Sequence, residues 1–443
     1  MSKHQSFDVL VIGGGMAGLT AAAALVKAGR SVVLVEKGVL GGTAVHAGYV
    51  WTAASAGVLR FVNPRGEPSL GQRLADDFAG AVDWVRSLGV DCKDAVDVLS
   101  YGRGHQTDLP GYLRACEQLV RKDERSEMLV GVRTDQLLLD AGRVTGARIT
   151  LANGNQRELR ATWTLLATGG FQANADMRAT LIHENARHMP VRSNWYSTGD
   201  GMRLAQAAGG SVWHENAGFY GHLFPGGITV GENDDFVGLA QMYSEHGVLV
   251  NLDGRRFTDE TEGDHLTTMQ LVEQREGRGL LIIDSRVREE WMLKPYVPGH
   301  VPRDNFDIAY RRGARCAVAE SLDDLLHLPE EWGYDGKQVR DAMDQFNAAC
   351  ANGLHTPPRR RDAMPIDRPP FYVMEVVPAI TFTFTGVQID TDARVLRADG
   401  SPVPGLLAAG ADVGGVYDRA YAGGLASALV FGLAAARTAA SDR

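Results

Sequence analysis

The glycine-rich N-terminal segment constrains the fold of this chain most strongly. Residues 7–12 (FDVLVI) form a run of apolar side chains rich in β-branched residues and interrupted only by Asp8, which is typical of a strand buried on both faces. Glycines follow over residues 13–18, and the alanine-rich segment after them predicts a helix that ends at Gly29. A second apolar strand over residues 31–35 ends at Glu36. A strand, a helix and a strand in this order predict an α/β fold with a parallel, Rossmann-like sheet.

Three glycines in this turn, Gly13, Gly15 and Gly18, have the GxGxxG spacing of dinucleotide-binding sites. The first permits a tight turn, the second lets the backbone approach a pyrophosphate, and the third allows close packing of the helix on the sheet. The N-terminus of the helix presents unpaired N–H groups to the phosphates. Glu36 stands 18 residues after Gly18, where a carboxylate binds a ribose and repels a 2′-phosphate. The pattern predicts a dinucleotide other than NADP, and by itself it does not separate FAD from NAD.

The character of the sequence changes in the middle of the chain. Another apolar strand, TLLATGG, ends in paired glycines, but between residues 212 and 365 charged and aromatic segments replace this pattern. The sheet pattern then resumes with a buried strand at PGLLAAG and an alanine-rich helix near the C-terminus. We therefore expect a dinucleotide-binding domain in two parts, residues 1–211 and 366–443, interrupted by an α+β domain over residues 212–365.

Local patterns indicate further elements. GVLVNLDGRRFTDE predicts a hairpin around Asp253 and Gly254, and GVQIDTDARVLRADG predicts a second hairpin. The amphipathic run VRDAMDQFNAACANG predicts a helix that is stopped by Gly353. The basic cluster PPRRRD over residues 357–362 lies beside prolines and is interpreted as a solvated linker.

Composition excludes several classes of function. The formal net charge is −9 without a basic tract, which argues against nucleic acid and anionic membranes as partners. The four cysteines are far apart and form no CxxC pattern, so no zinc ribbon, iron–sulfur cluster or other metal site is expected. No run of 18 uninterrupted apolar residues predicts a membrane span, and no secretory signal is recognised. We expect a cytoplasmic protein.

Five segments resemble, in the same order, a family of flavoproteins that contains fumarate reductases, 3-ketosteroid dehydrogenases and tricarballylate dehydrogenase-like enzymes. The segments are GGTAVHAGYVWTA, ATGGFQANADM, STGDGMRLAQAAGG, VLVNLDGRRFTDE and GLLAAGADVGG. The resemblance extends over nearly the whole chain. It implies FAD as cofactor, an FAD-binding domain split by a capping domain, and an active site between the two domains.

The resemblance also implies which residues contact FAD. They are Gly13, Gly15, Met16, Ala17, Gly18, Glu36, Lys37, Gly42, Thr43, Ala44, Gly48, Val132, Ala167, Thr168, Gly169, Asp200, Ala411, Asp412, Gly424, Ala426, Ser427 and Ala428. The start of the last helix would point its N–H groups at the N1–C2=O edge of the flavin, where reduced flavin carries negative charge. His46 is out of register with the histidine that attaches FAD covalently in respiratory relatives, so we expect non-covalent FAD.

The chemistry of this family is hydride exchange between flavin and a carbon β to a carbonyl or carboxylate, coupled to proton transfer at the α carbon. This chain departs from the soluble fumarate reductases at the residues that contact the substrate in those enzymes. Their clamping arginine corresponds to Tyr421, their proton-relay Glu and Arg to Ala240 and Tyr243, and their acid arginine to Asp264 or His265 in TEGDH. ITFTFTG and RAYAGG look more like the tricarballylate-dehydrogenase-like branch, and HAGYVW more like the ketosteroid dehydrogenases.

These departures suggest candidate residues for the reaction. Tyr421 is the candidate for proton transfer or carbonyl polarisation, because a phenol donates to a developing enolate. Arg419 is a candidate clamp for an anion or carbonyl, and His265, on a charged turn, is a candidate acid or base. We expect Tyr49, Tyr243 and Thr383 to line the substrate pocket. Asp264 is interpreted as solvated.

The sequence thus predicts an FAD-dependent oxidoreductase that dehydrogenates or reduces a C–C bond next to a carbonyl or carboxylate. The expected partners are a small-molecule substrate and an unidentified electron donor or acceptor. Three alternatives stay open: a flavin-dependent isomerase or hydratase without net redox change, a fumarate reductase-like electron-transfer subunit, and a dehydrogenase that uses NAD alone.

Overall fold

The computed structural model describes residues 6–213, 218–232, 234–295 and 301–442. The chain divides into two compact units. The first unit comprises Met1–Met177, Asn194–Phe219 and Phe382–Arg443, and the second comprises Arg178–Ser193 and Tyr220–Thr381. The boundaries of these units differ from the boundaries expected for the domains. The residues around 180–193 and 366–381 belong to the second unit, whereas the sequence placed them in the dinucleotide-binding domain.

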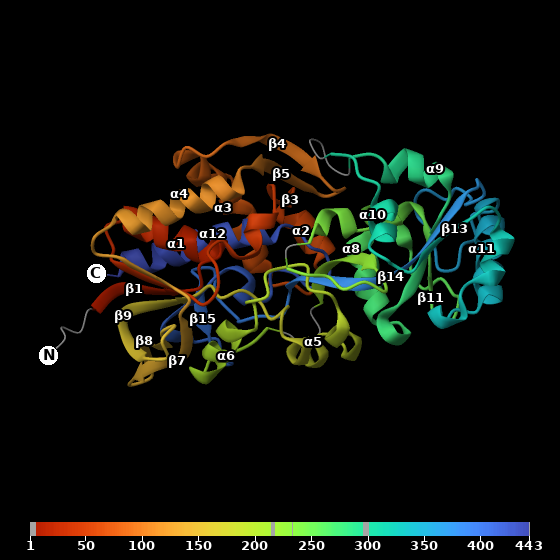
Figure 1. Cartoon of the computed structure of the whole chain (residues 1–443). Helices are drawn as coiled ribbons and strands as arrows, with labels where there is room; N and C mark the ends of the chain where they lie inside the picture. Colours follow the sequence, from red (N-terminus) through yellow and green to blue (C-terminus); the bar gives the residue numbers. More distant parts are fainter. Residues whose placement is uncertain (1–5, 214–217, 233, 296–300, 443) are drawn as a thin grey trace. The chain divides into compact units, whose positions relative to one another are not determined.

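An eight-stranded sheet lies at the centre of the first unit (Figure 1). Its main path is β15-β16-β9-β1-β2-β6, and β8 and β7 continue from β9. The strands are β1 (Ser6–Ile12), β2 (Val32–Glu36), β6 (Glu127–Val130), β7 (Arg133–Asp140), β8 (Arg143–Thr150), β9 (Gln156–Leu166), β15 (Arg394–Leu396) and β16 (Pro402–Ala408). β1 is parallel to β2 and to β9, and β9 is parallel to β16. The α/β fold and the parallel sheet predicted from the sequence are confirmed.

Helices pack on this sheet and on one another. In the first unit they are α1 (Met16–Lys27), α2 (Ala56–Val62), α3 (Pro68–Ser87), α4 (Leu109–Lys122), α6 (Asp200–Ala207) and α12 (Gly424–Ser441), and α5 (Ala175–Leu181) runs from the first unit into the second. α1 contacts α12 and α4, and α12 contacts α3 (Figure 1). Small alanine side chains on α1 and α12 allow this close approach.

A three-stranded antiparallel sheet completes the first unit. It consists of β3 (Tyr49–Ala53), β5 (Gly102–Thr107) and β4 (Cys92–Val98), in the order β3-β5-β4. Trp51 and Val50 of β3 are buried, whereas the side chains of β4 are largely exposed. β3 therefore presents apolar side chains to the interior of the unit.

The second unit is built on a five-stranded sheet with β10-β14-β12-β11 as its path and β13 paired to β14. Its strands are β10 (Phe219–Pro225), β11 (Val248–Asn251), β12 (Gly279–Ile283), β13 (Cys316–Ala319) and β14 (Phe371–Thr383). Its helices are α7 (Phe236–Leu239), α8 (Asp264–Val272), α9 (Ser285–Val287), α10 (Asn305–Arg311) and α11 (Gly336–Cys350). Val339, Met343 and Phe346 of α11 join the strands in one apolar core, so the predicted helix is confirmed.

Both predicted hairpins form, but each is held by only a short antiparallel contact. The chain does turn at Asp253 and Gly254, but only one bridge, between Val250 and Arg256, joins the two sides among the described residues. β11 instead pairs with β12 along its whole length. In the second case Ile389 and Val395 form a single bridge, and β15 pairs with β16. The local turns therefore form as predicted, and the longer strand pairing is made with β12 in the first case and with β16 in the second.

One helix among the described residues, α12, is long and apolar enough to cross a membrane by length and composition alone. Inside the structure 61% of its residues are buried, with α1 and α3 packed against it. It is placed as a core helix of the first unit.

Candidate functional site

The turn between β1 and α1 has the geometry that a pyrophosphate-binding loop requires. Gly13 has a φ of +109°, and a Cβ there would lie 2.1 Å from the carbonyl oxygen of Ala167. A Cβ at Gly18 would lie 1.9 Å from the carbonyl oxygen of Gly13, so only glycine allows helix and turn to meet. Gly15, which caps α1, has open space around it. No side chain therefore fills the space in front of Gly15, and the N–H groups at the start of α1 are accessible to a phosphate.

Glu36 ends β2, where the sequence placed it. One of its carboxylate oxygens accepts a hydrogen bond from the Gly14 N–H at 2.7 Å, and the other accepts from the Gly38 N–H at 2.6 Å. Val132, which is buried, donates its N–H to the carbonyl of Glu36. The acidic side chain is therefore held at the edge of the glycine turn.

Lys37 belongs to a small polar cluster with residues far along the chain. Its ammonium group lies 2.5 Å from the Asp200 carboxylate and 2.6 Å from the Thr198 hydroxyl. Thr43, on a 3₁₀ helix, accepts a hydrogen bond from the Asn194 side chain at 3.3 Å. Ala44 is buried, whereas Gly48 is exposed. Lys37, Asp200 and Thr43 are thus tied to other segments of the same unit.

Asp412 is a buried carboxylate in the 3₁₀ turn Gly410–Asp412, which follows β16. It accepts hydrogen bonds from the backbone N–H and the hydroxyl of Thr168. Burial raises the pKa of Asp412 to about 7, although the hydrogen bonds from Thr168 act in the opposite direction. The hydroxyl of Thr168 also accepts from the Gly201 N–H at 2.8 Å. This carboxylate connects the ATGG segment, the ADVGG segment and α6.

The N-terminus of α12 is fixed by a left-handed glycine. Gly423 has a φ of +92°, and a Cβ there would lie 1.6 Å from the Trp51 carbonyl oxygen. The Tyr417 hydroxyl donates to the carbonyls of Ala422 and Gly423, each at 3.1 Å. Gly424 opens the helix, and the side chains of Ala426, Ser427 and Ala428 are buried. The unpaired N–H groups of this turn provide a positive helix end.

The loop before α12, which carries Arg419 and Tyr421, is clamped by one asparagine. The buried side-chain oxygen of Asn63 accepts from three consecutive N–H groups, of Asp418, Arg419 and Ala420, each at 3.0 Å. Its amide donates to the Ala420 carbonyl at 2.9 Å. The loop is therefore held rigidly although Arg419 itself is exposed.

Tyr421 stands in a cluster of aromatic rings. Its ring lies 5.6 Å from Trp51, 6.0 Å from Tyr417 and 6.1 Å from Phe382, measured between ring centres. The Tyr101 hydroxyl donates to the backbone carbonyl of Tyr421 at 2.8 Å. Tyr421 is half-buried. The first unit thus surrounds the start of α12 with apolar, aromatic surface.

The other expected pocket residues differ in their surroundings. Thr383 is fully buried beside Gly170, and within the described residues its hydroxyl has no hydrogen-bond partner. Tyr49 is half-buried on β3. Tyr243 is buried in the second unit and donates its hydroxyl to the Gln241 side chain at 2.7 Å. Burial raises the pKa of Tyr243 well above that of a free tyrosine, so its phenol stays protonated.

The second unit contains a buried histidine–aspartate pair. Nδ1 of His222, on β10, lies 2.5 Å from Oδ2 of Asp264, the first residue of α8. His222 is 4% exposed and Asp264 is 3% exposed. The Tyr220 hydroxyl lies 2.8 Å from the other ring nitrogen, Nε2. Tyr220, His222 and Asp264 therefore form a continuous chain of hydrogen bonds.

The interpretation of Asp264 as a solvated residue is wrong, and His265 does not lie on an exposed turn. Both residues begin α8 and are buried. The His265 ring lies 6.4 Å from the Tyr220 ring, between centres. Within the TEGDH segment the Asp264 carboxylate is buried with a histidine partner, whereas Glu262 and Gly263 are only partly buried.

A cation lies close to this pair. The charge of Arg192 acts on both His222 and Asp264, and its guanidinium donates to the Thr381 hydroxyl at 3.0 Å. Burial lowers the pKa of His222, and the charge of Arg192 acts in the same direction. Burial alone would raise the pKa of Asp264, but His222, His265 and Arg192 hold it below its usual range. At neutral pH the pair is therefore a neutral imidazole beside a carboxylate.

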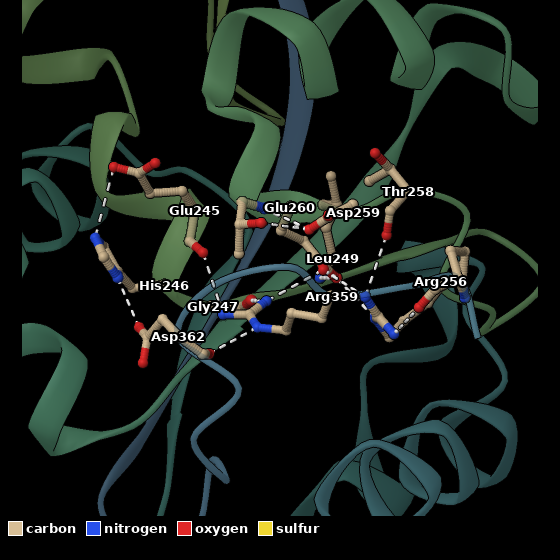
Figure 2. A network of polar contacts seen from close by, with 12 residues as sticks. Glu245, His246, Gly247, Leu249, Arg256, Thr258, Asp259, Glu260, Arg359 and Asp362 are labelled. Atoms are coloured by element: carbon tan, nitrogen blue, oxygen red, sulfur yellow. Dashed lines mark hydrogen bonds and ion pairs between the residues drawn. The ribbon is translucent and has the colours of Figure 1, made fainter. Parts of the chain in front are cut away.

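The segment that leads into α8 is fixed by a buried ion network (Figure 2). Glu260 receives hydrogen bonds from Arg256 at 2.6 Å and from Arg359 at 3.1 Å, and its other oxygen accepts from the Leu249 N–H. Arg359 also donates to the carbonyls of Gly247 and Glu245. The interpretation of residues 357–362 as a solvated linker is thus wrong for Arg359, whose side chain is 0% exposed.

The comparisons with known proteins agree with the first unit's geometry. A family model described as "FAD binding domain" matches residues 8–427. The chain belongs to this FAD binding domain family. This member of the family is an FAD-dependent oxidoreductase, and its cofactor is FAD.

Its similar proteins include reductases and a dehydrogenase. Urocanate reductase of Eggerthella lenta is 27% identical over 440 residues, which cover 92% of this chain and 70% of that protein. Fumarate reductase (cytochrome) of Shewanella frigidimarina is 26% identical, covering 99% of this chain and 78% of that protein. The structure of 3-ketosteroid delta1-dehydrogenase from Sterolibacterium denitrificans shares the fold, with a TM-score of 0.78, 20% identity and coverage of 99% and 100%.

The residues of the first unit fit FAD. The open glycine cradle at the start of α1 suits a pyrophosphate, and Glu36 at the end of β2 suits a ribose. The N-terminus of α12, which Gly423 exposes by its left-handed backbone, suits the negative edge of a reduced flavin. No group of three or more His, Cys, Asp or Glu side chains suited to a metal occurs in the part of the chain that the structure describes.

Sequence reasoning missed several residues that build the site. Asn63, Tyr101 and Tyr417 hold the loop around Tyr421, yet none belongs to a recognised motif. The pair of His222 and Asp264 joins positions 42 residues apart, and no spacing rule predicts it. The replacement of the family's acid arginine by TEGDH was the one signal that pointed to this region.

Proposed function

We propose that this protein dehydrogenates or reduces a carbon–carbon bond next to a carbonyl, in a substrate with an apolar, ring-containing body. FAD supplies the two-electron chemistry by exchanging a hydride with the carbon β to the carbonyl. The observation that carries this proposal is the aromatic cluster of Trp51, Phe382, Tyr417 and Tyr421 at the start of α12. Aromatic surface binds flat apolar molecules and gives little energy to a small dicarboxylate.

The charges support the same class of substrate. Tyr421 stands at the position of the clamping arginine of fumarate reductases, and the nearest cation in sequence, Arg419, is exposed. A phenol polarises one carbonyl oxygen, whereas a dicarboxylate needs bidentate cationic partners. Among its relatives are a urocanate reductase and fumarate reductases, and a 3-ketosteroid delta1-dehydrogenase shares its fold. Of these substrate classes, a ketosteroid-like molecule fits the aromatic cluster best.

The proposed roles of the chain's own residues follow from their chemistry. Tyr421 donates a hydrogen bond to the carbonyl oxygen where negative charge develops. Arg419 binds an anionic or carbonyl group at the rim, and His265 contributes to proton exchange. Tyr49 and Thr383 contribute to the pocket lining in the first unit. We also propose that the protein acts in the cytoplasm on a small molecule and exchanges electrons with a separate donor or acceptor.

Anaerobic spectral titration tests this function. The FAD-loaded protein is mixed with saturated cyclic ketones and ketosteroids, and the photoreduced protein is mixed with cyclic enones, fumarate and an unsaturated tricarboxylate. Bleaching by a saturated ketone, or reoxidation by an enone, is the expected result. Reoxidation by fumarate alone would instead favour the fumarate reductase-like alternative. Turnover of a substrate without any change in the flavin spectrum would favour an isomerase or hydratase.

A further inference from the structure

We propose that Asn63 is a positioning residue, which sets where the Tyr421 phenol and the N-terminus of α12 stand within the first unit. This inference rests on the proposed function, because it concerns the same carbonyl-polarising phenol and the helix end that suits a reduced flavin. It goes further by assigning their placement to the turn between α2 and α3, which stands far earlier in the sequence. Asn63 precedes Ala420, its main contact, by 357 residues.

The Asn63 side chain uses all of its bonding capacity on one short segment. Its oxygen accepts from three consecutive N–H groups, those of Asp418, Arg419 and Ala420, each at 3.0 Å. Its amide nitrogen donates to the Ala420 carbonyl at 2.9 Å. Because Asn63 is only 2% exposed, water does not replace these partners when they are lost. The backbone at 418–420 is therefore held in the one conformation in which three N–H groups converge on a single atom.

Other residues of the same turn add contacts to the same loop. The Arg65 guanidinium donates to the Asp418 carboxylate at 3.0 Å. The Glu67 N–H donates to the Gly415 carbonyl at 2.7 Å. Residues 63–67 thus dock on residues 415–420 at several points, and Asn63 supplies most of the hydrogen bonds.

The turn itself is anchored to regular structure. Asn63 ends α2 as its C-cap, and its N–H donates to the Leu59 carbonyl at 2.9 Å. α2 contacts α3 and β3, and β3 carries Trp51, whose ring lies 5.6 Å from the Tyr421 ring. The fixed end of the clamp is therefore part of the same scaffold that holds the aromatic cluster.

The backbone beyond the clamp is also fixed, so a shift at 418–420 is carried forward. The Tyr101 hydroxyl donates to the Tyr421 carbonyl at 2.8 Å. Burial raises the pKa of Tyr101 well above that of a free tyrosine, so its hydroxyl keeps the proton that it donates. The Tyr417 hydroxyl donates to the carbonyls of Ala422 and Gly423. Movement of the clamped segment therefore moves the phenol and the first N–H groups of α12 together.

Two measurable properties depend on this placement. The aligned N–H groups at the start of α12 favour the negative charge of a reduced flavin, so their loss of alignment lowers the reduction potential of bound FAD. The Tyr421 phenol polarises a carbonyl only within hydrogen-bond distance, and a misplacement of about 1 Å costs on the order of 10²-fold in rate. A residue that merely stabilises the fold changes neither property.

Asn347 provides the matched control. Its amide donates to the Ile366 carbonyl at 2.9 Å, and its oxygen accepts from the Ile366 N–H at 2.8 Å. It is half-buried on α11, in the second unit, which holds none of the residues that fit FAD. Asn347 thus clamps a distant segment by the same two groups as Asn63, without a connection to α12.

The reduction potential of bound FAD tests the proposal in Asn63→Leu, Tyr101→Phe and Asn347→Leu. Each variant is purified with FAD and titrated spectroelectrochemically without oxygen. We expect a lower potential in Asn63→Leu, a smaller fall in Tyr101→Phe and the wild-type value in Asn347→Leu. A wild-type potential in Asn63→Leu, or an equal shift in Asn347→Leu, would contradict the proposal. If Asn63→Leu fails to retain FAD, Tyr101→Phe decides, since it removes only one hydroxyl from the same loop.

Hydrogen exchange reports on the clamp directly. The backbone amides of residues 418–420 should exchange faster in Asn63→Leu than in the wild type, because their acceptor is gone. Their exchange should not change in Asn347→Leu. Unchanged protection in Asn63→Leu would show that the loop is held without Asn63.

Stopped-flow reduction by the ketone found in titration tests the link to Tyr421. We expect Asn63→Leu to lower the limiting rate by roughly 10- to 10²-fold, with little change in the ketone concentration that gives half of this rate. The double variant Asn63→Leu/Tyr421→Phe should lose less than the product of the two single losses, since both changes affect one phenol. A loss equal to the full product would show that Asn63 does not act through Tyr421.

Failure of this proposal differs from failure of the proposed function. The potential and the exchange rates need FAD but no substrate, so they test Asn63 even if no compound of the panel changes the flavin spectrum. If a ketone reduces the wild type while Asn63→Leu keeps the wild-type potential, exchange and rate, Asn63 is not a positioning residue, although the function stands.

Discussion

Single side chains in this protein take their chemistry from what surrounds them. Asp412 has ordinary hydrogen-bond partners, yet burial raises its pKa to about 7. Asp264 is equally buried, but the neighbouring His222 lowers its pKa. Burial acts to raise the pKa of both aspartates, but only Asp264 has a basic partner, which brings its pKa below the usual range.

Asp412→Asn should change how stability depends on pH. The pKa of Asp412 in the folded protein, about 7, lies above the ordinary value of about 3.9 in an unfolded chain. Its ionisation therefore costs nothing below pH ~4 and destabilises the fold increasingly up to pH ~7, by on the order of 4 kcal/mol. Urea unfolding of the FAD-free protein at pH 5 and pH 8 measures this. The wild type should lose more stability than Asp412→Asn between these values, and equal losses would contradict the assignment.

Tyr421→Phe should slow flavin reduction by about 10²-fold, because the hydroxyl that polarises the carbonyl is removed while the ring packing remains. Trp51, Tyr417 and Phe382 keep the same neighbours, so FAD content should not change. Stopped-flow reduction under anaerobic conditions gives the rate. An unchanged rate would remove Tyr421 from the mechanism.

At the scale of elements, the start of α8 depends on a buried ion network rather than on helix propensity. Glu260 stands four residues before Asp264 and is held by Arg256 and Arg359 (Figure 2). A buried carboxylate with two guanidinium partners fixes the chain ahead of the helix. The geometry of the His222 pair therefore depends on a side chain about 100 residues further along the sequence.

Arg359→Met should destabilise the protein by about 3–5 kcal/mol, since it leaves Glu260 with one cationic partner and the backbone carbonyls of Glu245, Gly247 and Asp362 without their donor. Arg360→Ala is the matched control, because the neighbouring Arg360 side chain is 70% exposed. It should change the free energy of unfolding by less than about 0.5 kcal/mol. Denaturant unfolding followed by circular dichroism measures both. Equal effects of the two variants would show that Arg359 is not an internal support.

At the scale of the whole molecule, a ligand that binds only one of the two compact units should stabilise that unit more than the other. The residues that fit FAD all lie in the first unit. FAD at about 1,000 times its dissociation constant should stabilise the structure that binds it by about 4 kcal/mol. In calorimetry we expect FAD to raise the temperature of one transition, and Arg359→Met to lower a different one. A single transition that shifts equally in both experiments would show that the units unfold together.

The sequence allowed prediction of the parts that depend on local pattern. The strand, glycine turn and helix over residues 7–29 form as expected, because buried β-branched side chains and the glycine positions leave few other conformations. The main strand partner of β11 and the burial of Arg359 were missed, since their partners, β12 and Glu260, are distant in sequence. The hydrogen-bonded chain of Tyr220, His222 and Asp264 depends on tertiary contacts alone, which a single sequence does not reveal.

The clamp of Asn63 on residues 418–420 has a consequence for synthesis of the chain. β16 and α12 lie in the last forty or so residues and complete the central sheet and the cover of α1. While the ribosome is still making the middle segment, the apolar side of α1 has no α12 to cover it, and Asn63 has no loop to bind. The newly made N-terminal half therefore exposes apolar surface to water until α12 has been synthesised. Loss of the last helix alone should leave such a half-built product, prone to aggregate.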